Sequence, residues 1–200
     1  GNYIRALSDQ ELYKWTLPFI TGTGDAALEI NPENPQPAPK VGPEYSGIAL
    51  GDDGEPYCVD KSMNMTSADV KAKLLALMPL IKERLKYLTD AAEMVHFLFT
   101  EPSVPPVDQI VPKKLDAAKT KEVLEKAKDF VKALPGLEHE AQEELAKKYA
   151  EELGIKLGDF MMPIRMAVTG SRVSPPLMGS ILILGVEKSI ERIDRTLAAF

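Results

Sequence analysis

The residue with the clearest chemical potential in this chain is Arg165, which stands among apolar neighbours in residues 158–184, GDFMMPIRMAVTGSRVSPPLMGSILIL. An arginine in such surroundings either extends its charge to solvent along an apolar surface or is held in place to recognise a ligand. Residues 169–172 predict a turn with Gly170 at a positive φ. The Ser174 hydroxyl and the prolines after it are typical of a helix N-terminus, where a hydroxyl and an arginine can bind a base edge or a phosphate. A capped helix in a small bundle is the purely structural alternative.

The rest of the sequence contains no recognisable catalytic or metal-binding motif. Phosphate-binding loops, dinucleotide-binding glycine motifs, zinc-protease motifs and nucleophile elbows are all absent from it. The single cysteine, Cys58, excludes a disulfide framework within the chain and a cysteine-rich zinc site, and it has no base beside it. We expect His96 to be a core or boundary residue and His139 to lie on the surface. The two histidines are far apart in the sequence, which argues against a histidine-based metal centre.

The net charge of −6 is unevenly distributed over the 200 residues. Residues 1–65 contain four Lys/Arg and ten Asp/Glu, whereas residues 156–200 contain six and four. An acidic chain argues against general coating of nucleic acid, but the mildly basic C-terminal part remains compatible with binding it. No apolar run reaches the about 18–20 residues that span a bilayer, and residues 1–5 show no signal peptide, so we expect a cytoplasmic protein.

Helical periodicity predicts the elements of the N-terminal part. Residues 8–11, SDQE, form a capping-box pattern before a helix whose apolar face contains Leu12, Trp15 and Phe19 and which ends near Pro18.

A second helix is expected to start at Thr66 or Ser67, with Pro79 breaking or restarting it and the pattern continuing to Leu88. Thr89 is then the predicted cap of a further helix, which ends at residues 101–102.

The C-terminal part predicts a second helical block. Its expected helices lie near residues 116–134, 138–153, 160–169, 176–184 and 187–199. We expect Met161, Met162 and Met166 to fill the core between them.

Proline-rich stretches divide the chain. Residues 21–62 predict an irregular insertion, with a small hairpin within residues 45–54, and residues 102–111 predict a linker. The fold class expected is therefore all-α, with two consecutive helical subdomains in residues 1–101 and 112–200.

Residues 165–170 and 174–177 together give the pattern R-x-A-x-T-G-x-x-x-S-P-x-L, which resembles the C-terminal anticodon-binding domain of bacterial glutamyl-tRNA synthetases. Residues 184–193, LGVEKSIERI, are similar to the L-G-x-E-x-x-x-x-R-I/L segment that closes this family. Residues 2–8 resemble the segment after the catalytic and stem-contacting domains, and residues 79–101 resemble the first anticodon-contacting helical domain.

This resemblance implies an anticodon-binding helical cage without its catalytic domain, because the ATP and glutamate motifs of the family are missing from the sequence. The chain would be the C-terminal part of a class I synthetase that attaches glutamate to its tRNA with ATP and Mg²⁺. It would itself be non-catalytic and free of cofactors. The implied partner is the anticodon loop of tRNA(Glu), bound by a monomer, with no role for DNA or membranes.

The resemblance also assigns roles to residues of the second block. Arg165 would contact an anticodon base, and Ser174, Pro175 and Leu177 would form the adjacent base pocket, with Arg172 binding the tRNA nearby. An arginine offers a planar set of donors to an unstacked base, and apolar neighbours offer packing surface.

In the first block the resemblance favours Arg84 as the reader of the third anticodon base, with Lys82 and Lys86 as neighbouring basic residues. A free-standing helical module of the same fold, which binds RNA or protein without a role in aminoacylation, is the alternative function.

Overall fold

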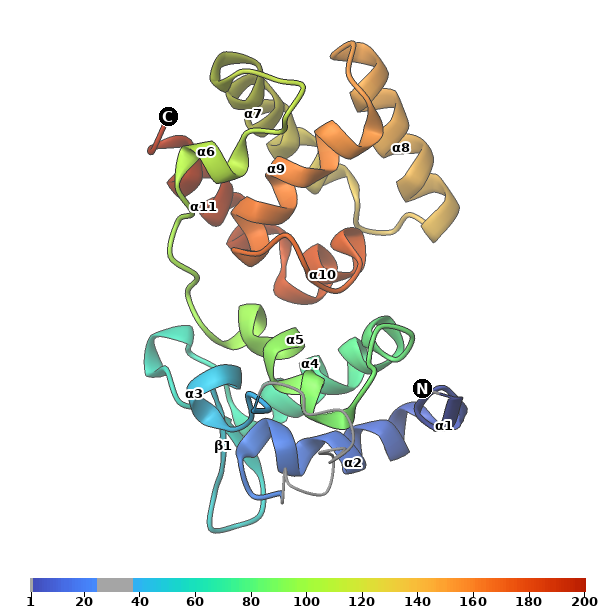
Figure 1. Ribbon diagram of the computed structural model, residues 1–200, viewed down its shortest axis with the longest axis vertical. Helices are drawn as coiled ribbons and strands as arrows, with labels where there is room; N and C mark the ends of the chain where they lie inside the picture. Colours follow the sequence, from blue (N-terminus) through green and yellow to red (C-terminus); the bar gives the residue numbers. More distant parts are fainter. Residues whose placement is uncertain (1, 25–37) are drawn as a thin grey trace. The chain divides into compact units, whose positions relative to one another are not determined.

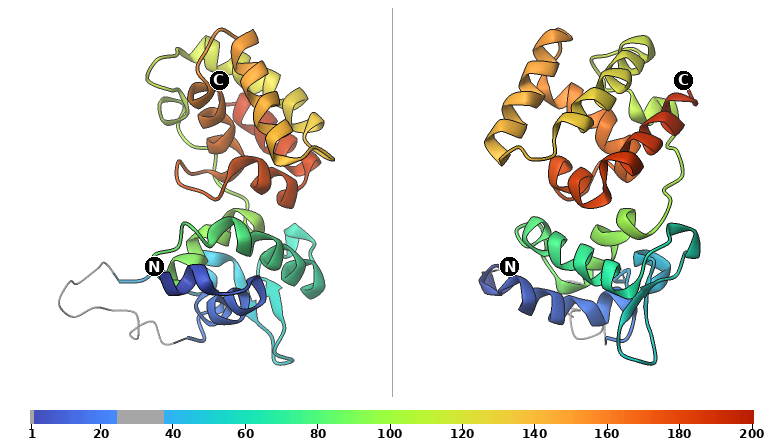
Figure 2. Two further views of the ribbon diagram at one scale, coloured as in Figure 1. Left: turned by 90° about the vertical axis from the view of Figure 1, so that its right-hand side faces the viewer. Right: turned by 180° about the vertical axis from the view of Figure 1, so that it is seen from behind.

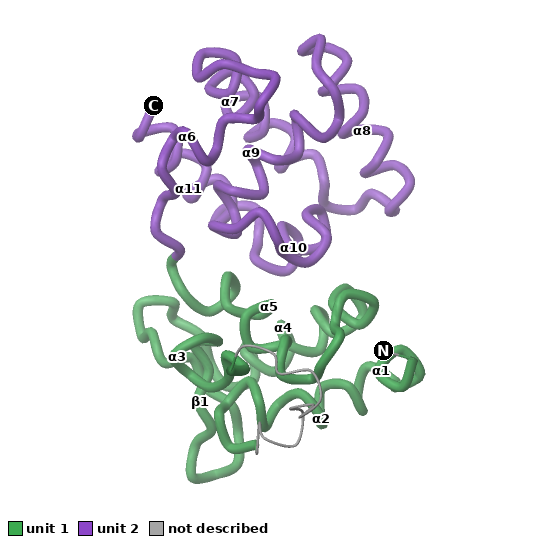
Figure 3. Tube along the Cα trace, in the orientation of Figure 1, with its two compact units in different colours: residues 1–101 green, residues 102–200 purple. Residues whose placement is uncertain are grey.

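The computed structural model describes residues 2–24 and 38–200, which form eleven α-helices and one two-stranded antiparallel sheet (Figure 1). The predicted all-α class is confirmed. The chain divides into two compact units, Gly1–Glu101 and Pro102–Phe200 (Figure 3). Each unit buries its own apolar side chains.

The first unit is built around α2, which packs against both α4 and α5 (Figure 1). Its helices are α1 (Asn2–Ala6), α2 (Asp9–Thr21), α3 (Pro43–Ser46), α4 (Ser67–Ile81) and α5 (Ala91–Phe99). Its other elements are β1 (Ile48–Leu50), β2 (Pro56–Cys58) and the short 3₁₀ helices η2 (Lys61–Met63) and η3 (Leu88–Asp90).

The second unit is built around α9, which packs against all the other helices of that unit. These helices are α6 (Val107–Ile110), α7 (Ala117–Ala133), α8 (His139–Glu152), α9 (Leu157–Thr169), α10 (Leu177–Leu184) and α11 (Val186–Leu197). Phe130, Tyr149 and Phe160 form an aromatic cluster, with ring centroids 5.3–6.0 Å apart, where α7, α8 and α9 meet.

The helix starts at residues 8 and 66 are set by capping boxes. The Ser8 hydroxyl accepts a hydrogen bond from the Glu11 N–H, and the Glu11 carboxylate accepts one from the Ser8 N–H. Thr66 and Asp69 form the same reciprocal pair at the start of α4. Each box satisfies backbone donors that a helix N-terminus otherwise leaves unpaired, and both predicted starts are confirmed.

Among the described residues, three prolines lie in helix interiors: Pro18 in α2, Pro79 in α4 and Pro163 in α9. The predictions that a helix ends near Pro18 and that Pro79 breaks or restarts one are therefore wrong. An interior proline removes a backbone hydrogen bond and crowds the preceding turn, at a cost of about 3 kcal/mol. Helix α4 continues because Met78 and Ile81, on either side of its proline, are fully buried. Burial on both sides of the proline offsets its local cost.

The predicted core-facing side of α2 is confirmed for Leu12 and Phe19, which are both buried, and is wrong for Trp15. Leu12, Thr16 and Ile20 are fully buried, whereas Trp15 is 51% exposed. Thr16 can be buried because its hydroxyl donates to the Leu12 carbonyl at 2.8 Å, which satisfies the polar group within the helix. A pattern that counts only apolar residues misses this threonine and places Trp15 in the core.

The cap of α5 is Asp90 rather than the predicted Thr89, which is buried in η3. The Asp90 carboxylate accepts hydrogen bonds from the backbone N–H groups of Lys86 and Tyr87, at 3.1 and 3.0 Å. Asp90 therefore fixes the turn before α5.

The predicted insertion at 21–62 is ordered over its described C-terminal half, and residues 25–37 lie outside the described residues. Strands β1 and β2 pair Ile48 with Cys58 and Leu50 with Pro56. Figure 2 shows the ribbon of the same region from two further sides. The hairpin thus lies further along the chain than the predicted 45–54. Ile48 and Cys58 are both buried, so this stretch contributes to the core of the first unit.

The predicted linker 102–111 belongs to the second unit and contains α6. Ile110 is fully buried, and the Arg195 guanidinium donates to the Pro102 carbonyl at 2.8 Å. Distant residues therefore anchor a proline-rich stretch whose composition alone indicates a linker.

Among the described helices, none is both long and apolar enough to cross a membrane.

Candidate nucleic-acid interface

Helix α9 ends in a tight turn at Gly170, which has a φ of +71°. The Gly170 N–H donates to the Met166 carbonyl at 2.9 Å, which closes the helix in the left-handed conformation that glycine favours. A Cβ at this position would lie 2.7 Å from Cβ of Pro102, so the turn also has no room for a side chain. The predicted positive φ is confirmed. We name residues 170–176, between α9 and α10, the 170–176 loop.

Arg165 spans the 170–176 loop from α9. Its Nη1 donates to the Ser174 hydroxyl at 2.5 Å and to the Pro175 carbonyl at 3.0 Å. The Arg165 side chain is half-buried, as expected for an arginine whose stem lies along an apolar surface. Helix α10 begins at Leu177 with Pro176 as N-cap and no side-chain cap bond. The prediction that the Ser174 hydroxyl caps this helix is therefore wrong, because that hydroxyl binds Arg165 instead.

The residues expected to form a base pocket lie beneath the loop surface. Ser174, Pro175 and Leu177 are all buried. The exposed part of the loop is its tip, where Arg172 lies next to Val173, which is 73% exposed. The loop thus has an inner layer of hydroxyl and apolar groups and an outer layer that carries a positive charge.

The tip of the loop combines an anchored arginine with an exposed valine. Arg172 Nη2 donates to the Gln109 carbonyl of α6 at 3.0 Å, which ties the tip to the start of the unit. Sequence reasoning missed Val173, although an apolar residue between Arg172 and Ser174 in a turn is a signal that could have identified it. A bare apolar side chain at a loop tip can pack on the face of an unstacked base.

Methionines flank Arg165 on α9. Met161 and Met162 precede it by four and three residues, which places them on the same helix face, and both are half-buried. Met166, by contrast, lies in the core. The prediction of three core methionines is therefore wrong for two of them, which instead offer adaptable apolar surface beside the guanidinium.

Arg84 lies in the turn after α4, not on the helix itself, and its side chain is exposed. Its N–H donates to the Ile81 carbonyl at 2.8 Å. The neighbouring Lys82 is only 18% exposed, and its Nζ pairs with the Asp9 carboxylate at 2.7 Å. This ion pair holds the Lys82 side chain against α2. Arg84 and Lys86 are the exposed basic side chains of the turn.

The Arg84 turn is held on both sides. Glu83 pairs with Arg5 of α1 at 3.1 Å, and Asp90 accepts two backbone N–H groups from the turn's last residues. The hydrogen bonds to Asp90 and from the Arg84 N–H fix the backbone of the turn from which the exposed Arg84 side chain extends.

Within residues 2–24 and 38–200, no three His, Cys, Asp or Glu side chains gather as metal ligands would. Cys58 is buried, its Sγ donates to the Phe99 carbonyl, and burial raises the pKa of the thiol. His139 is exposed on α8, as predicted, and His96 is half-buried on α5.

Exposed arginines such as Arg84 and Arg172 can stack on or hydrogen-bond unstacked bases of single-stranded RNA. The family of the anticodon binding domain matches residues 51–197, and the chain belongs to this family. The match begins at 51, so residues 51–62 are part of the family domain and not of an insertion.

The curated relatives include glutamate–tRNA ligases. The enzyme of Treponema denticola is 43% identical over 198 residues, which are 99% of this chain and 36% of that protein. The enzyme of Roseiflexus castenholzii is 35% identical over 198 residues, which are 99% of this chain and 32% of that protein. This chain therefore spans about a third of the length of the relatives that it matches. Both alignments extend through the predicted insertion.

A solved structure shares the fold. The crystal structure of a glutamate tRNA ligase from Elizabethkingia meningosepticum, in complex with its amino acid, matches with a TM-score of 0.51 at 18% identity. The match covers 98% of this chain and 30% of that one.

Proposed function

We propose that this chain is the tRNA-binding, anticodon-recognising C-terminal part of a glutamyl-tRNA synthetase. The observation that carries the proposal is the 43% identity to a glutamate–tRNA ligase across 99% of the chain but only 36% of that enzyme. The full-length protein would attach glutamate to its tRNA using ATP and Mg²⁺ in the cytoplasm. The partner of this chain is the anticodon loop of tRNA(Glu), which it binds as a monomer.

The residues of this chain do not fit ATP or Mg²⁺. Its sequence lacks the ATP and glutamate motifs of the family that it resembles, and the described residues contain no cluster of three metal-ligating side chains. These groups would belong to a catalytic domain outside the chain, and this part alone does not catalyse aminoacylation.

In the second unit, Arg165 and Arg172 contact the anticodon loop. The half-buried Arg165 guanidinium already donates to a hydroxyl and a carbonyl, and both groups chemically resemble acceptors on a base edge. Ser174, Pro175 and Leu177 are buried in the unbound chain. A base therefore reaches these residues only when the 170–176 loop changes its conformation. Arg165 then exchanges its hydrogen bonds to Ser174 and Pro175 for hydrogen bonds to the base.

In the first unit, Arg84 reads the third anticodon base. The proposal is supported by the exposure of the Arg84 side chain. It is also supported by the ion pair between Lys82 and Asp9, because a lysine held in this pair is less available to bind a base.

Replacement of Arg84 or Arg165 by alanine should remove discrimination at one anticodon position. Each bidentate contact between an arginine and a base contributes about 1–3 kcal/mol of discrimination. Fluorescence anisotropy with the tRNA(Glu) anticodon stem-loop, and with stem-loops changed at one anticodon base each, measures the effect. The matched controls are Lys86→Ala in the Arg84 turn and Lys156→Ala at the other end of α9, both exposed lysines.

Equal weakening toward every stem-loop would mark a phosphate contact and contradict the assignment. Loss of discrimination with Lys86→Ala instead of Arg84→Ala would move the third-base role to the lysine. If the unchanged chain binds no stem-loop at low salt, the free-standing protein-interaction module becomes the better description.

A further inference from the structure

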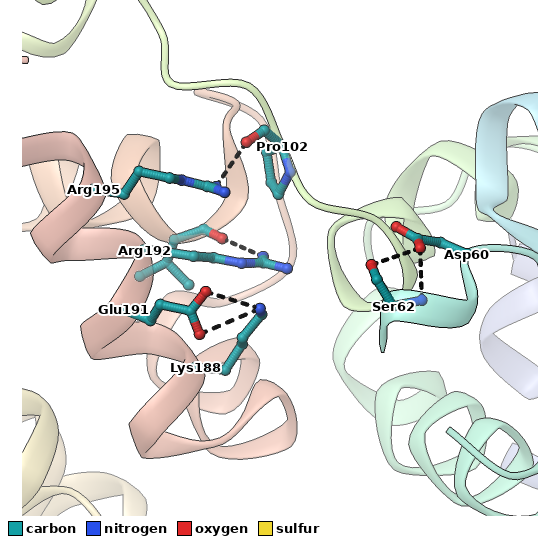
Figure 4. Close-up of polar contacts among 8 residues, drawn as sticks. Asp60, Ser62, Pro102, Lys188, Glu191, Arg192 and Arg195 are labelled. Atoms are coloured by element: carbon teal, nitrogen blue, oxygen red, sulfur yellow. Dashed lines mark hydrogen bonds and ion pairs between the residues drawn. The ribbon is translucent and has the colours of Figure 1, made fainter. Parts of the chain in front are cut away.

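Helix α11 turns two arginines toward the segments that frame the 170–176 loop (Figure 4). Arg192 is completely buried, although arginine is among the residues least often found inside a protein. Arg195 follows one turn later and is half-buried. Neither side chain belongs to the anticodon contacts proposed above.

Arg192 binds the end of α9. Its Nη1 donates to the Val168 carbonyl at 2.7 Å. Val168 lies in the last turn of α9, where carbonyl groups have no partner within the helix. A charged donor at this place also interacts favourably with the negative end of the helix dipole. Arg192 thus fixes the carbonyl end from which the 170–176 loop departs.

Arg195 binds Pro102, which lies against Gly170, the first residue of the 170–176 loop. Its Nη2 donates to the Pro102 carbonyl at 2.8 Å. The ring of Pro102 lies so close to Gly170 that a Cβ on the glycine would be 2.7 Å from it. Arg195 therefore holds the surface against which the Gly170 turn packs.

We propose that Arg192 and Arg195 are positioning residues for anticodon discrimination, which they exert through the 170–176 loop. The two arginines of α11 fix the start of this loop, and Arg165 binds its far end at Ser174 and Pro175. The part of the inference that concerns discrimination rests on the function proposed above. The part that concerns the loop's position is independent of RNA.

Hydrogen exchange tests the position of the loop in the 200-residue chain. The variants are Arg192→Met and Arg195→Met, which keep the aliphatic stem but lose the donors, and Arg195→Lys, which keeps one charged donor. The matched control is Lys188→Met, which loses the same charge from α11 at a residue that pairs with Glu191 of the same helix (Figure 4).

In both methionine variants, the amides of residues 170–174 should exchange about tenfold faster or more, because a hydrogen bond from a charged donor is lost. The amides of α7 and α8 should keep their protection, and Lys188→Met should behave like the unchanged chain. Unchanged exchange in the loop of Arg195→Met would overturn the proposal, even if Arg192→Met, with its buried site, fails to fold.

Anisotropy with the anticodon stem-loops then separates positioning from general stabilisation. Arg195→Met should lower the ratio of affinities for the cognate and the altered loops at the position that Arg165 reads, and Arg195→Lys should restore most of this ratio. A uniform loss of affinity with an unchanged ratio would overturn the proposal. If the unchanged chain binds no stem-loop, the proposed function fails, and the exchange result alone decides whether the two arginines position the loop.

Discussion

Arg165 has a structural role in this chain, and we propose that it also recognises an anticodon base. Its guanidinium presents several donors in one plane, and Nη1 alone contacts both the Ser174 hydroxyl and the Pro175 carbonyl. A lysine would supply a point charge without this planar geometry. The loop therefore keeps the arginine oriented. In the proposed function a base edge takes the place of these two acceptors, so less entropy is lost on binding.

Cys58 provides a test of the packing of the first unit. The thiol is buried and burial raises its pKa, so little reactive thiolate is present at neutral pH. We expect Cys58 of the native chain to react far more slowly with a thiol reagent at pH 7 than in guanidinium chloride, as followed by absorbance. Equal rates in the two conditions would show that β2 does not pack as described.

At the scale of elements, the two capping boxes define helix starts by local chemistry alone. Thr66→Ala removes the hydroxyl that accepts from the Asp69 N–H and should destabilise the chain by about 0.5–2 kcal/mol. Urea denaturation followed by circular dichroism measures this loss. The control is Ser67→Ala at the next position, which lies within the helix and should have little effect. A larger loss in the control than in Thr66→Ala would place the cap elsewhere.

The same box makes the stability of α4 depend on pH. Hydrogen bonds from the Thr66 N–H and hydroxyl lower the pKa of the Asp69 carboxyl. Because the pKa is lower in the folded chain, the stabilisation is fully present above the ordinary pKa of an aspartate. It is lost as the pH falls through the folded value. Below about pH 4 the difference between Thr66→Ala and the unchanged chain should therefore shrink, as measured by the same denaturation series.

At the scale of the whole molecule, the first unit ends at Glu101, the end predicted for the first subdomain, and the second unit begins at Pro102, within the predicted linker. A fragment of residues 102–200 keeps the Arg195 contact to the Pro102 carbonyl and the buried Ile110. A fragment of residues 112–200 loses both.

We expect the longer fragment to be more stable, by at least the about 1.5–3 kcal/mol that burial of one isoleucine side chain contributes. Thermal unfolding of the two fragments measures the difference. Equal stabilities would show that residues 102–111 behave as a linker after all.

Much of the fold was predictable because its signals are local. The capping residues Ser8 and Thr66 and the glycine at 170 depend on groups within a few residues of one another, and all agree with the structure. Helical periodicity predicted the fold class, although it misplaced Trp15 and the effect of Pro79. The motif around Arg165, whose role in reading the anticodon stays a proposal, is likewise visible as residue types at fixed spacing. These features together determined the fold class and the location of the candidate site.

Tertiary packing decided what local signals could not. Helix α4 continues past Pro79 because the burial of Met78 and Ile81 outweighs the cost of the proline. Tertiary packing also leaves Trp15 half-exposed on the surface. It buries Ser174 and Leu177 beneath the surface of the loop. Burial depends on partners that are distant in the sequence, and a pattern of residue types does not contain them.

The bond between Arg195 and Pro102 shows this division most clearly, since it joins residues 93 positions apart. The sequence by itself determined a helical, arginine-bearing, anticodon-binding chain. Only the tertiary structure decided that Arg192 and Arg195 bind the segments next to the 170–176 loop, because these contacts depend on how α11 packs against α9.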